Sequence, residues 1–302
     1  EVGRAIPEPA ARDLYADHLL KCSPSRLDGL SVVLDCAHGA AFEVAPRVFR
    51  ELGARVHAIH CQPDGTNINV RCGSTHMEAL QAEVVARGAD MGLAFDGDAD
   101  RCLAVDERGQ VVDGDPMMAI FADWLQQQGR LANHLVVATV MSNVGLEVTL
   151  REQGVRLVRA NVGDRYVLEG MKEHGAVLGG EQSGHIILLE HATTGDGTLA
   201  ALMLARIVRE TGQPLSALAD RMPRFPQRLV NVPARYKERL DQDREIGAAI
   251  QRLEERLARR GRILVRPSGT EPLVRVMAEG PDLDELEQVV GELSRLIQQR
   301  LS

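Results

Sequence analysis

Alternating β-rich and helix-periodic segments over the first two-thirds of the chain constrain its fold most. Apolar runs such as 30–35 and 89–96 are separated by segments, including 40–52 and 74–88, whose apolar residues recur with a helical period. Strands that are joined through helices need crossover connections, which produce a mostly parallel sheet with helices on both faces. We therefore predict an α/β fold for this part of the chain.

The same pattern starts again after the turn-rich cluster 106–109, and the second series resembles the first in length and order. This similarity indicates an internal duplication. From Pro223 onwards, short strand-like runs accompany two amphipathic helices, which is typical of a small α+β domain. We predict two similar three-layer α/β domains with mixed, mostly parallel sheets at residues 1–109 and 110–222, followed by an α+β domain at 223–302.

Composition excludes several classes of protein. The net charge of −8 argues against a general nucleic-acid surface. The five cysteines are odd in number and contain no C-x-x-C pair, so neither a disulfide framework nor a zinc site is indicated. No stretch approaches the roughly 18 to 20 apolar residues of a membrane span. We expect a cytoplasmic protein with reduced thiols that binds neither nucleic acid nor membrane.

An acidic loop, DGDADR at 96–101, follows directly after a predicted buried strand. Two like charges about 4 Å apart repel by roughly 1 kcal/mol in water and by several times that near a protein surface. A hard divalent cation such as Mg²⁺ or Ca²⁺ removes this repulsion. We predict Asp96, Asp98 and Asp100 as metal ligands, with a solvated acidic turn as the alternative.

Two other acidic motifs fit this loop less well. An EF-hand starting at Asp96 would find Glu107 at its last ligand position, but Arg101 stands where its invariant glycine belongs, and strands flank the loop. Phosphatases of the haloacid dehalogenase type favour Thr or Val two residues after the second aspartate, where this chain has Asp100.

A second loop, GGEQSGH at 179–185, begins with a glycine pair that allows a tight turn and close approach to a ligand. Glu181 and Ser183 offer the acceptors and the donor that bind adjacent sugar hydroxyls. His185 can exchange a proton near neutral pH. The alternatives are an ordinary glycine-rich turn and a structural histidine.

A third loop, RPSGTEPLVRV at 266–276, combines two guanidinium groups with two hydroxyls and a flexible backbone. Charge-assisted hydrogen bonds from such groups to a phosphate contribute about 1.5–3 kcal/mol each. The Walker pattern is absent, and a plain turn between strands is the alternative. The predicted phosphate-binding residues are Arg266, Ser268, Gly269, Thr270 and Arg275.

In this order and at these separations, the three loops resemble the α-D-phosphohexomutase superfamily, which carries its metal, sugar and phosphate loops on its second, third and fourth domains. The resemblance covers essentially the whole chain. The segments 63–69, 72–76 and 162–167 are similar to the bacterial phosphoglucosamine mutase branch. So is Gln182, where the phosphomannomutase/phosphoglucomutase branch usually carries Met.

The resemblance implies an isomerase that interconverts glucosamine 6-phosphate and glucosamine 1-phosphate through a phosphoserine and a bisphosphorylated sugar, for UDP-N-acetylglucosamine synthesis. It implies Mg²⁺ as the cofactor and a hexosamine phosphate as the substrate. Arg101 and His185 are the candidates for stabilising transferred oxygens or moving a proton. Arg165 and His38 are candidates for lining the cleft, with a helix-start arginine and a structural histidine as the alternatives.

One departure from the family pattern is large. The family's first domain holds its phosphorylated serine in a Ser-His-Asn-Pro loop, and no Ser-His-Asn occurs in these 302 residues. We therefore expect the chain to lack the phosphoserine domain, to be inactive alone and to require that N-terminal domain as its partner. The alternatives are a non-catalytic phosphosugar-binding module, a metal-dependent phosphatase, and a phosphomannomutase/phosphoglucomutase.

Overall fold

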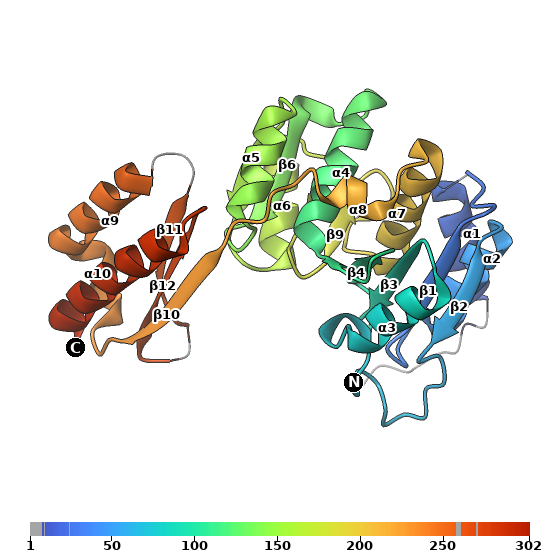
Figure 1. The fold of residues 1–302 in the computed structure, drawn as a ribbon, viewed down its shortest axis with the longest axis horizontal. Helices are drawn as coiled ribbons and strands as arrows, with labels where there is room; N and C mark the ends of the chain where they lie inside the picture. The colour runs from blue at the N-terminus through green and yellow to red at the C-terminus, as the bar shows by residue number, and fades with distance from the viewer. Residues whose placement is uncertain (1–7, 9, 24, 258–260, 270) are drawn as a thin grey trace, which may run out of the picture. The chain divides into compact units, whose positions relative to one another are not determined.

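The computed structural model divides into two compact units (Figure 1). The first unit comprises the chain up to Ser142 together with Thr149–Met222, and the second comprises Asn143–Val148 and Pro223–Ser302. The structure describes residues 8, 10–23, 25–257, 261–269 and 271–302.

The first sheet of the first unit has the strand order β2-β1-β3-β4-β5. Strands β2, β1 and β3 are parallel, whereas β4 and β5 run antiparallel to their neighbours. Helices α2 (Ala41–Glu51) and α3 (Glu78–Arg87) provide the crossovers, and α1 (Ala11–Cys22) precedes the sheet. The strands are β1 (Ser31–Asp35), β2 (Arg55–Ile59), β3 (Met91–Phe95), β4 (Cys102–Asp106) and β5 (Val111–Val112).

The second sheet repeats this arrangement with the order β7-β6-β8-β9, in which only β9 is antiparallel. Its crossover helices are α5 (Val144–Glu152) and α6 (Asp164–His174). The two sheets therefore share one topology, and the α/β duplication predicted from the sequence is confirmed. The strands are β6 (Leu135–Thr139), β7 (Arg156–Ala160), β8 (Leu178–Gly180) and β9 (Ile186–Leu188).

The shared topology places two of the predicted functional loops at equivalent positions. The metal loop, 96–101, joins β3 to β4, and the sugar loop, 179–185, covers the turn from β8 to β9. Each loop thus lies where the parallel part of its sheet ends and the chain turns back as an antiparallel strand.

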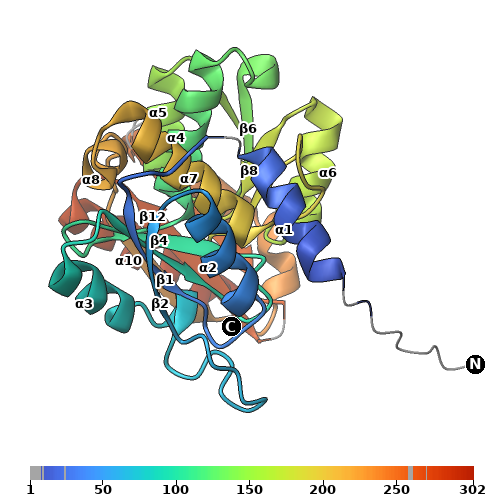
Figure 2. The same cartoon turned by 90° about the vertical axis from the view of Figure 1, so that its right-hand side faces the viewer.

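Helices pack on the two sheets through aliphatic side chains, as the scarcity of aromatic residues requires. On the first sheet, Leu80 and Val84 of α3 pack on strand residues such as Val33. On the second, Val167 and Met171 of α6 do the same. Helices α4 (Gly114–Gln127) and α7 (Gly197–Thr211) are mostly buried, and α7 contacts strands of both sheets (Figure 2). Helix α7 therefore ties the two halves of this unit together.

The remaining elements of the first unit are short. They are η1 (Gly73–Thr75), η2 (Ala132–His134) and α8 (Leu215–Ala219). The turn at 106–109, which marked the predicted domain boundary, joins β4 to β5, so the first sheet continues to Val112. Among the described residues, no helix is long and apolar enough to cross a membrane.

The second unit is built on an antiparallel sheet with the order β10-β12-β11. Its helices pack on one face of the sheet around a core that includes Ile246, Val276 and Leu293. The Asp282 side chain caps the last helix by accepting from the backbone N–H groups of Asp284 and Glu285. The elements are β10 (Gln227–Pro233), η3 (Lys237–Gln242), α9 (Arg244–Leu257), β11 (Arg262–Pro267), β12 (Leu273–Glu279) and α10 (Leu283–Leu301).

Candidate active site

The metal loop gathers the three predicted aspartates. One carboxylate oxygen from each of Asp96, Asp98 and Asp100 lies within 4.8 Å of the others. Ala99 between them takes a left-handed φ of 63°, which folds the loop back so that alternate side chains converge. Asp96 is largely buried, whereas Asp98 is exposed. The donor set consists of oxygens alone and is open on one side, as Mg²⁺ prefers.

Electrostatic repulsion within this cluster is strong when no cation is bound. Burial, followed by the charge of Asp100, raises the pKa of Asp96 to about 6. An oxygen of Asp100 is buried and makes no hydrogen bond among the described residues. A divalent cation would neutralise these carboxylates and could coordinate this oxygen, so the residues fit a hard metal ion.

Cation binding is expected to weaken as the pH falls below about 6. In the metal-free chain, Asp96 holds an extra proton in the folded state between its ordinary pKa of 3.8 and about 6, so stability decreases as the pH rises through that window. A bound cation removes this penalty, because it favours the charged carboxylates. Excess Mg²⁺ should therefore raise the Tm more at about pH 8 than at about pH 5. Equal shifts in thermal unfolding at the two values would contradict the assignment.

Arg101 closes the metal loop. Its Nε lies 3.8 Å from an Asp96 oxygen and 3.7 Å from an Asp100 oxygen. The side chain is 44% exposed, so the guanidinium balances part of the acidic charge and still reaches solvent. This position is compatible with the predicted contact to transferred phosphate oxygens.

Backbone hydrogen bonds join the metal loop to the sugar loop. The N–H of Cys102 donates to the carbonyl of Gly184 at 3.1 Å, and Arg101 forms a β-bridge with His185. The N–H of Gly197 donates to the carbonyl of Ala99 at 2.9 Å. The structure thus places the metal loop and the sugar loop side by side within the first unit.

His185, the last residue of the sugar loop, has a buried side chain. Its side chain is only 2% exposed, and its Nε2 accepts the backbone N–H of Gly195 at 3.2 Å. Because Nε2 accepts this bond, the proton of the neutral ring belongs on Nδ1. Nε2 also lies 3.7 Å from an Asp100 oxygen. That separation is longer than a hydrogen bond, and proton transfer by His185 stays a prediction.

The sugar-loop side chains form a small hydrogen-bonded group. Glu181 accepts the backbone N–H of Gly163 on one oxygen at 3.0 Å and the hydroxyl of Ser183 on the other at 3.2 Å. Gly163 precedes α6, which carries Arg165. The Arg165 side chain is exposed and bonds Glu169 on its own helix at 2.8 Å. These contacts favour the alternative that Arg165 is an ordinary arginine at the start of a helix.

His38 precedes the metal loop in the sequence and follows β1. Its Nδ1 accepts the backbone N–H of Gln62 at 3.2 Å, and its ring contacts that of His60 edge-on. These contacts hold loops together after β1 and β2 and favour the structural alternative. The next residues do approach the metal loop, since the N–H of Ala40 donates to the carbonyl of Gly97 at 2.8 Å.

The phosphate loop occupies the hairpin between β11 and β12 in the second unit. Arg266 and Arg275 are directly opposite each other in the antiparallel register. Arg275 also pairs with Glu271 at 3.5 Å, and a bound phosphate would add a second counter-charge beside the two arginines. Ser268 is buried, Gly269 is exposed, and the predicted Thr270 lies outside the described residues.

Lys237 was not anticipated from the sequence. Its ammonium donates to the carbonyl oxygens of Ser268 and Glu271 at 2.5 and 2.8 Å, so it clamps the phosphate loop from η3. No motif surrounds this lysine, and its role depends on a contact between distant segments. The Lys237 ammonium also adds positive charge to the phosphate loop.

Comparison with known families follows the same division of the chain. Residues 13–109, 113–225 and 229–296 match, in that order, the phosphoglucomutase/phosphomannomutase alpha/beta/alpha domain II, alpha/beta/alpha domain III and C-terminal domain. The chain belongs to the phosphohexomutase superfamily.

Among curated relatives, the phosphoglucosamine mutase of Moorella thermoacetica is 56% identical over 296 residues, which are 98% of this chain and 67% of that protein. The phosphoglucosamine mutase of Streptomyces coelicolor is 52% identical over 300 residues, which are 99% of this chain and 66% of that protein. The chain thus spans about two-thirds of the length of these relatives.

Solved structures show the same fold at low identity. A phosphoglucomutase/phosphomannomutase family protein from Burkholderia thailandensis superposes with a TM-score of 0.80 at 23% identity, covering 96% of this chain and 65% of the other. The N-acetylphosphoglucosamine mutase of Aspergillus fumigatus, solved with GlcNAc-6P and magnesium, gives 0.74 at 20% identity, covering 97% and 67%.

Proposed function

We propose that this chain is the metal-, sugar- and phosphate-binding part of a phosphoglucosamine mutase that interconverts glucosamine 6-phosphate and glucosamine 1-phosphate. The observation that carries the proposal is the contact of the acidic loop with the sugar loop, through the bridge of Arg101 with His185 and the hydrogen bond from Cys102 to Gly184. Identities above 50% to proteins named phosphoglucosamine mutase over nearly the whole chain support the choice of sugar.

In the proposed mechanism, Asp96, Asp98 and Asp100 would hold Mg²⁺, which would neutralise charge on the transferring phosphoryl group. Arg101, beside two of these aspartates, would orient the phosphoryl oxygens. Ser183 would exchange its bond to Glu181 for a sugar hydroxyl, and the free Glu181 oxygen would accept from a neighbouring hydroxyl.

Arg266 and Arg275 would bind the phosphate that is not being transferred. The sugar would turn over between two transfers, so this clamp would accept either end of the bisphosphorylated intermediate. A clamp built of two opposed guanidinium groups suits this task, because it recognises the dianion rather than the carbon that carries it.

The phosphoryl-carrying serine would come from outside these 302 residues. The absence of a Ser-His-Asn sequence and the matched two-thirds of the relatives' length support this part of the proposal. We expect no mutase turnover from the 302-residue chain alone and measurable turnover once it is joined to the serine-bearing first domain of a relative. Full activity of the chain alone would overturn the proposal, and a preference for glucose phosphates in the joined enzyme would overturn the choice of substrate.

Substitution of Arg266 by Ala is expected to weaken binding of glucosamine 6-phosphate about 10- to 150-fold, as loss of a charge-assisted pair costs about 1.5–3 kcal/mol. Isothermal titration calorimetry measures this change. Arg252→Ala is the matched control, because Arg252 is an exposed arginine of α9 in the same unit. Equal affinities of the wild type and Arg266→Ala would remove the phosphate-clamp assignment.

A further inference from the structure

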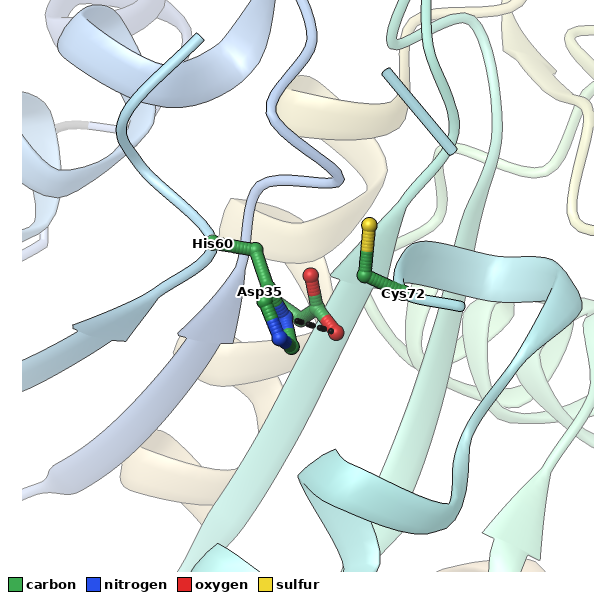
Figure 3. A group of neighbouring side chains, drawn as sticks. All are labelled: Asp35, His60 and Cys72. Carbon is green, nitrogen blue, oxygen red and sulfur yellow. Dashed lines mark ion pairs between the residues drawn. The ribbon is translucent and has the colours of Figure 1, made fainter. Parts of the chain in front are cut away.

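A second cluster of metal-ligating side chains lies at the carboxyl edge of the first sheet. Asp35 ends β1, His60 follows β2 and Cys72 precedes η1. Figure 3 shows the three side chains meeting from these separate segments. One carboxylate oxygen, one imidazole nitrogen and the sulfur all lie within 4.8 Å of one another. None of these residues has a part in the proposed mutase mechanism.

The side chains of this cluster are mostly buried, unlike those of a chance contact on the surface. Asp35 and Cys72 are fully buried, and the His60 side chain is 27% exposed. The ring of His60 therefore leaves a route from solvent to the other two groups. A buried carboxylate that is shielded from water needs partners for its remaining lone pairs.

The His60 nitrogen lacks a hydrogen bond although it touches the carboxylate. Nδ1 lies 3.0 Å from an Asp35 oxygen, yet it is buried and its direction makes no hydrogen bond among the described residues. This 3.0 Å contact is the ion pair that Figure 3 marks with a dashed line, and it places two potential ligand atoms beside each other.

Backbone groups hold the Asp35 carboxylate in place. One oxygen accepts the N–H of Ala37 at 2.9 Å, and the other accepts the N–H of Gly73 at 3.0 Å. Such outer contacts orient a ligating carboxylate and leave lone pairs for an ion. Gly73 is also the neighbour of Cys72, so the same bond fixes the segment that carries the thiol.

We propose that Asp35, His60 and Cys72 form a binding site for a borderline-soft divalent cation of the Zn²⁺ type. Three protein ligands of the O, N and S kinds suit zinc, which takes a fourth ligand from water or another donor, whereas Mg²⁺ takes oxygen ligands. Zinc bonds of about 2.0–2.3 Å place neighbouring ligands roughly 3.3–3.8 Å apart, and the three ligand atoms already lie within 4.8 Å of one another. Binding replaces the Cys72 thiol proton, which passes to the buffer.

This site would lie close to the metal loop without sharing a ligand with it. A Cβ atom at Gly73 would come within 2.4 Å of the carbonyl oxygen of Phe95, the residue before Asp96. The two sites differ in donor chemistry, because the metal loop offers only oxygens. Spectroscopy can therefore distinguish them, and the inference does not depend on the proposed mutase activity.

The test is a Co²⁺ titration of the chain after treatment with EDTA. A thiolate ligand gives an intense sulfur-to-cobalt charge-transfer band in the near ultraviolet, which a carboxylate-only site does not give. We expect this band in the wild type, its loss on addition of Zn²⁺, and its persistence in excess Mg²⁺. Absence of the band would overturn the proposal.

Variants identify the ligands. Cys72→Ser is expected to abolish the band and to lower Zn²⁺ affinity at least about 100-fold, since even outer-shell changes cost 10- to 100-fold. His60→Gln, at a partly exposed position, should lower Zn²⁺ affinity at least about tenfold while circular dichroism shows an intact fold.

Two further cysteines serve as controls. Cys22, whose sulfur lies 3.5 Å from His18 Nε2, offers a competing thiol–imidazole pair. Cys61 interacts with the thiol of Cys36. The band should persist in Cys22→Ser and in Cys61→Ser. Its loss in either variant together with its survival in Cys72→Ser would place the ion elsewhere and overturn the proposal.

Discussion

Replacing Asp98 with Asn is expected to lower mutase turnover about 10²- to 10³-fold in the chain joined to the serine-bearing first domain of a relative, with little effect on the fold. A bound metal ion stabilises a phosphoryl-transfer transition state by several kcal/mol, and each 1.36 kcal/mol is a tenfold change in rate. Asp98 is exposed and lies in the oxygen cluster of the metal loop. The amide keeps the shape of the side chain but removes its charge.

Steady-state turnover over a series of Mg²⁺ concentrations measures this effect, and a high concentration should restore part of the lost activity. Asp220→Asn is the control, because Asp220 is 69% exposed and forms a surface ion pair with Arg108. The metal-site assignment is wrong if Asp98→Asn turns over within about twofold of the wild type at every Mg²⁺ concentration.

Gly197→Ala is expected to destabilise the first unit by about 1–3 kcal/mol and to weaken cation binding at the metal loop. A Cβ atom at Gly197 would lie 2.3 Å from the carbonyl oxygen of Arg101 and 2.8 Å from that of Ala99. Both are backbone atoms of the metal loop, which cannot rotate away as a side chain would. Relief therefore requires the loop, and with it the converging aspartates, to move.

Urea unfolding and a Mg²⁺ titration of the same variant measure the two effects together. Gly247→Ala is the matched control, because Gly247 is exposed within α9 and no atom lies near its added Cβ. This control should gain up to about 1 kcal/mol, as alanine favours a helix interior. An unfolding midpoint for Gly197→Ala equal to or above that of the wild type would contradict the close contact.

Several parts of the fold follow directly from the sequence. The periodicity around Val33 and Leu80 reflects which face of each element is buried, and this property depends on residues near in sequence. The short strand β5 was not anticipated, because its two residues carry no periodic signal of their own. It forms only because the turn at Asp106–Gly109 brings it alongside β4.

The candidate site divides in the same way. The acidic loop was predicted from its spacing alone, because Asp96, Asp98 and Asp100 are near neighbours whose repulsion needs a partner. The contact of the metal loop with the sugar loop and the burial of His185 were not predictable. Both depend on how α7 and two strand ends pack together.

By itself, the sequence determined the α/β class, the duplicated pattern and which functional groups each loop carries, because helices, strands and short motifs are decided by residues close along the chain. Only the tertiary structure decided that Arg266 faces Arg275 across a hairpin, that Lys237 supports that loop, and that Asp35, His60 and Cys72 meet. These proximities arise from strand register and crossover packing, which join residues far apart in sequence and leave no local pattern.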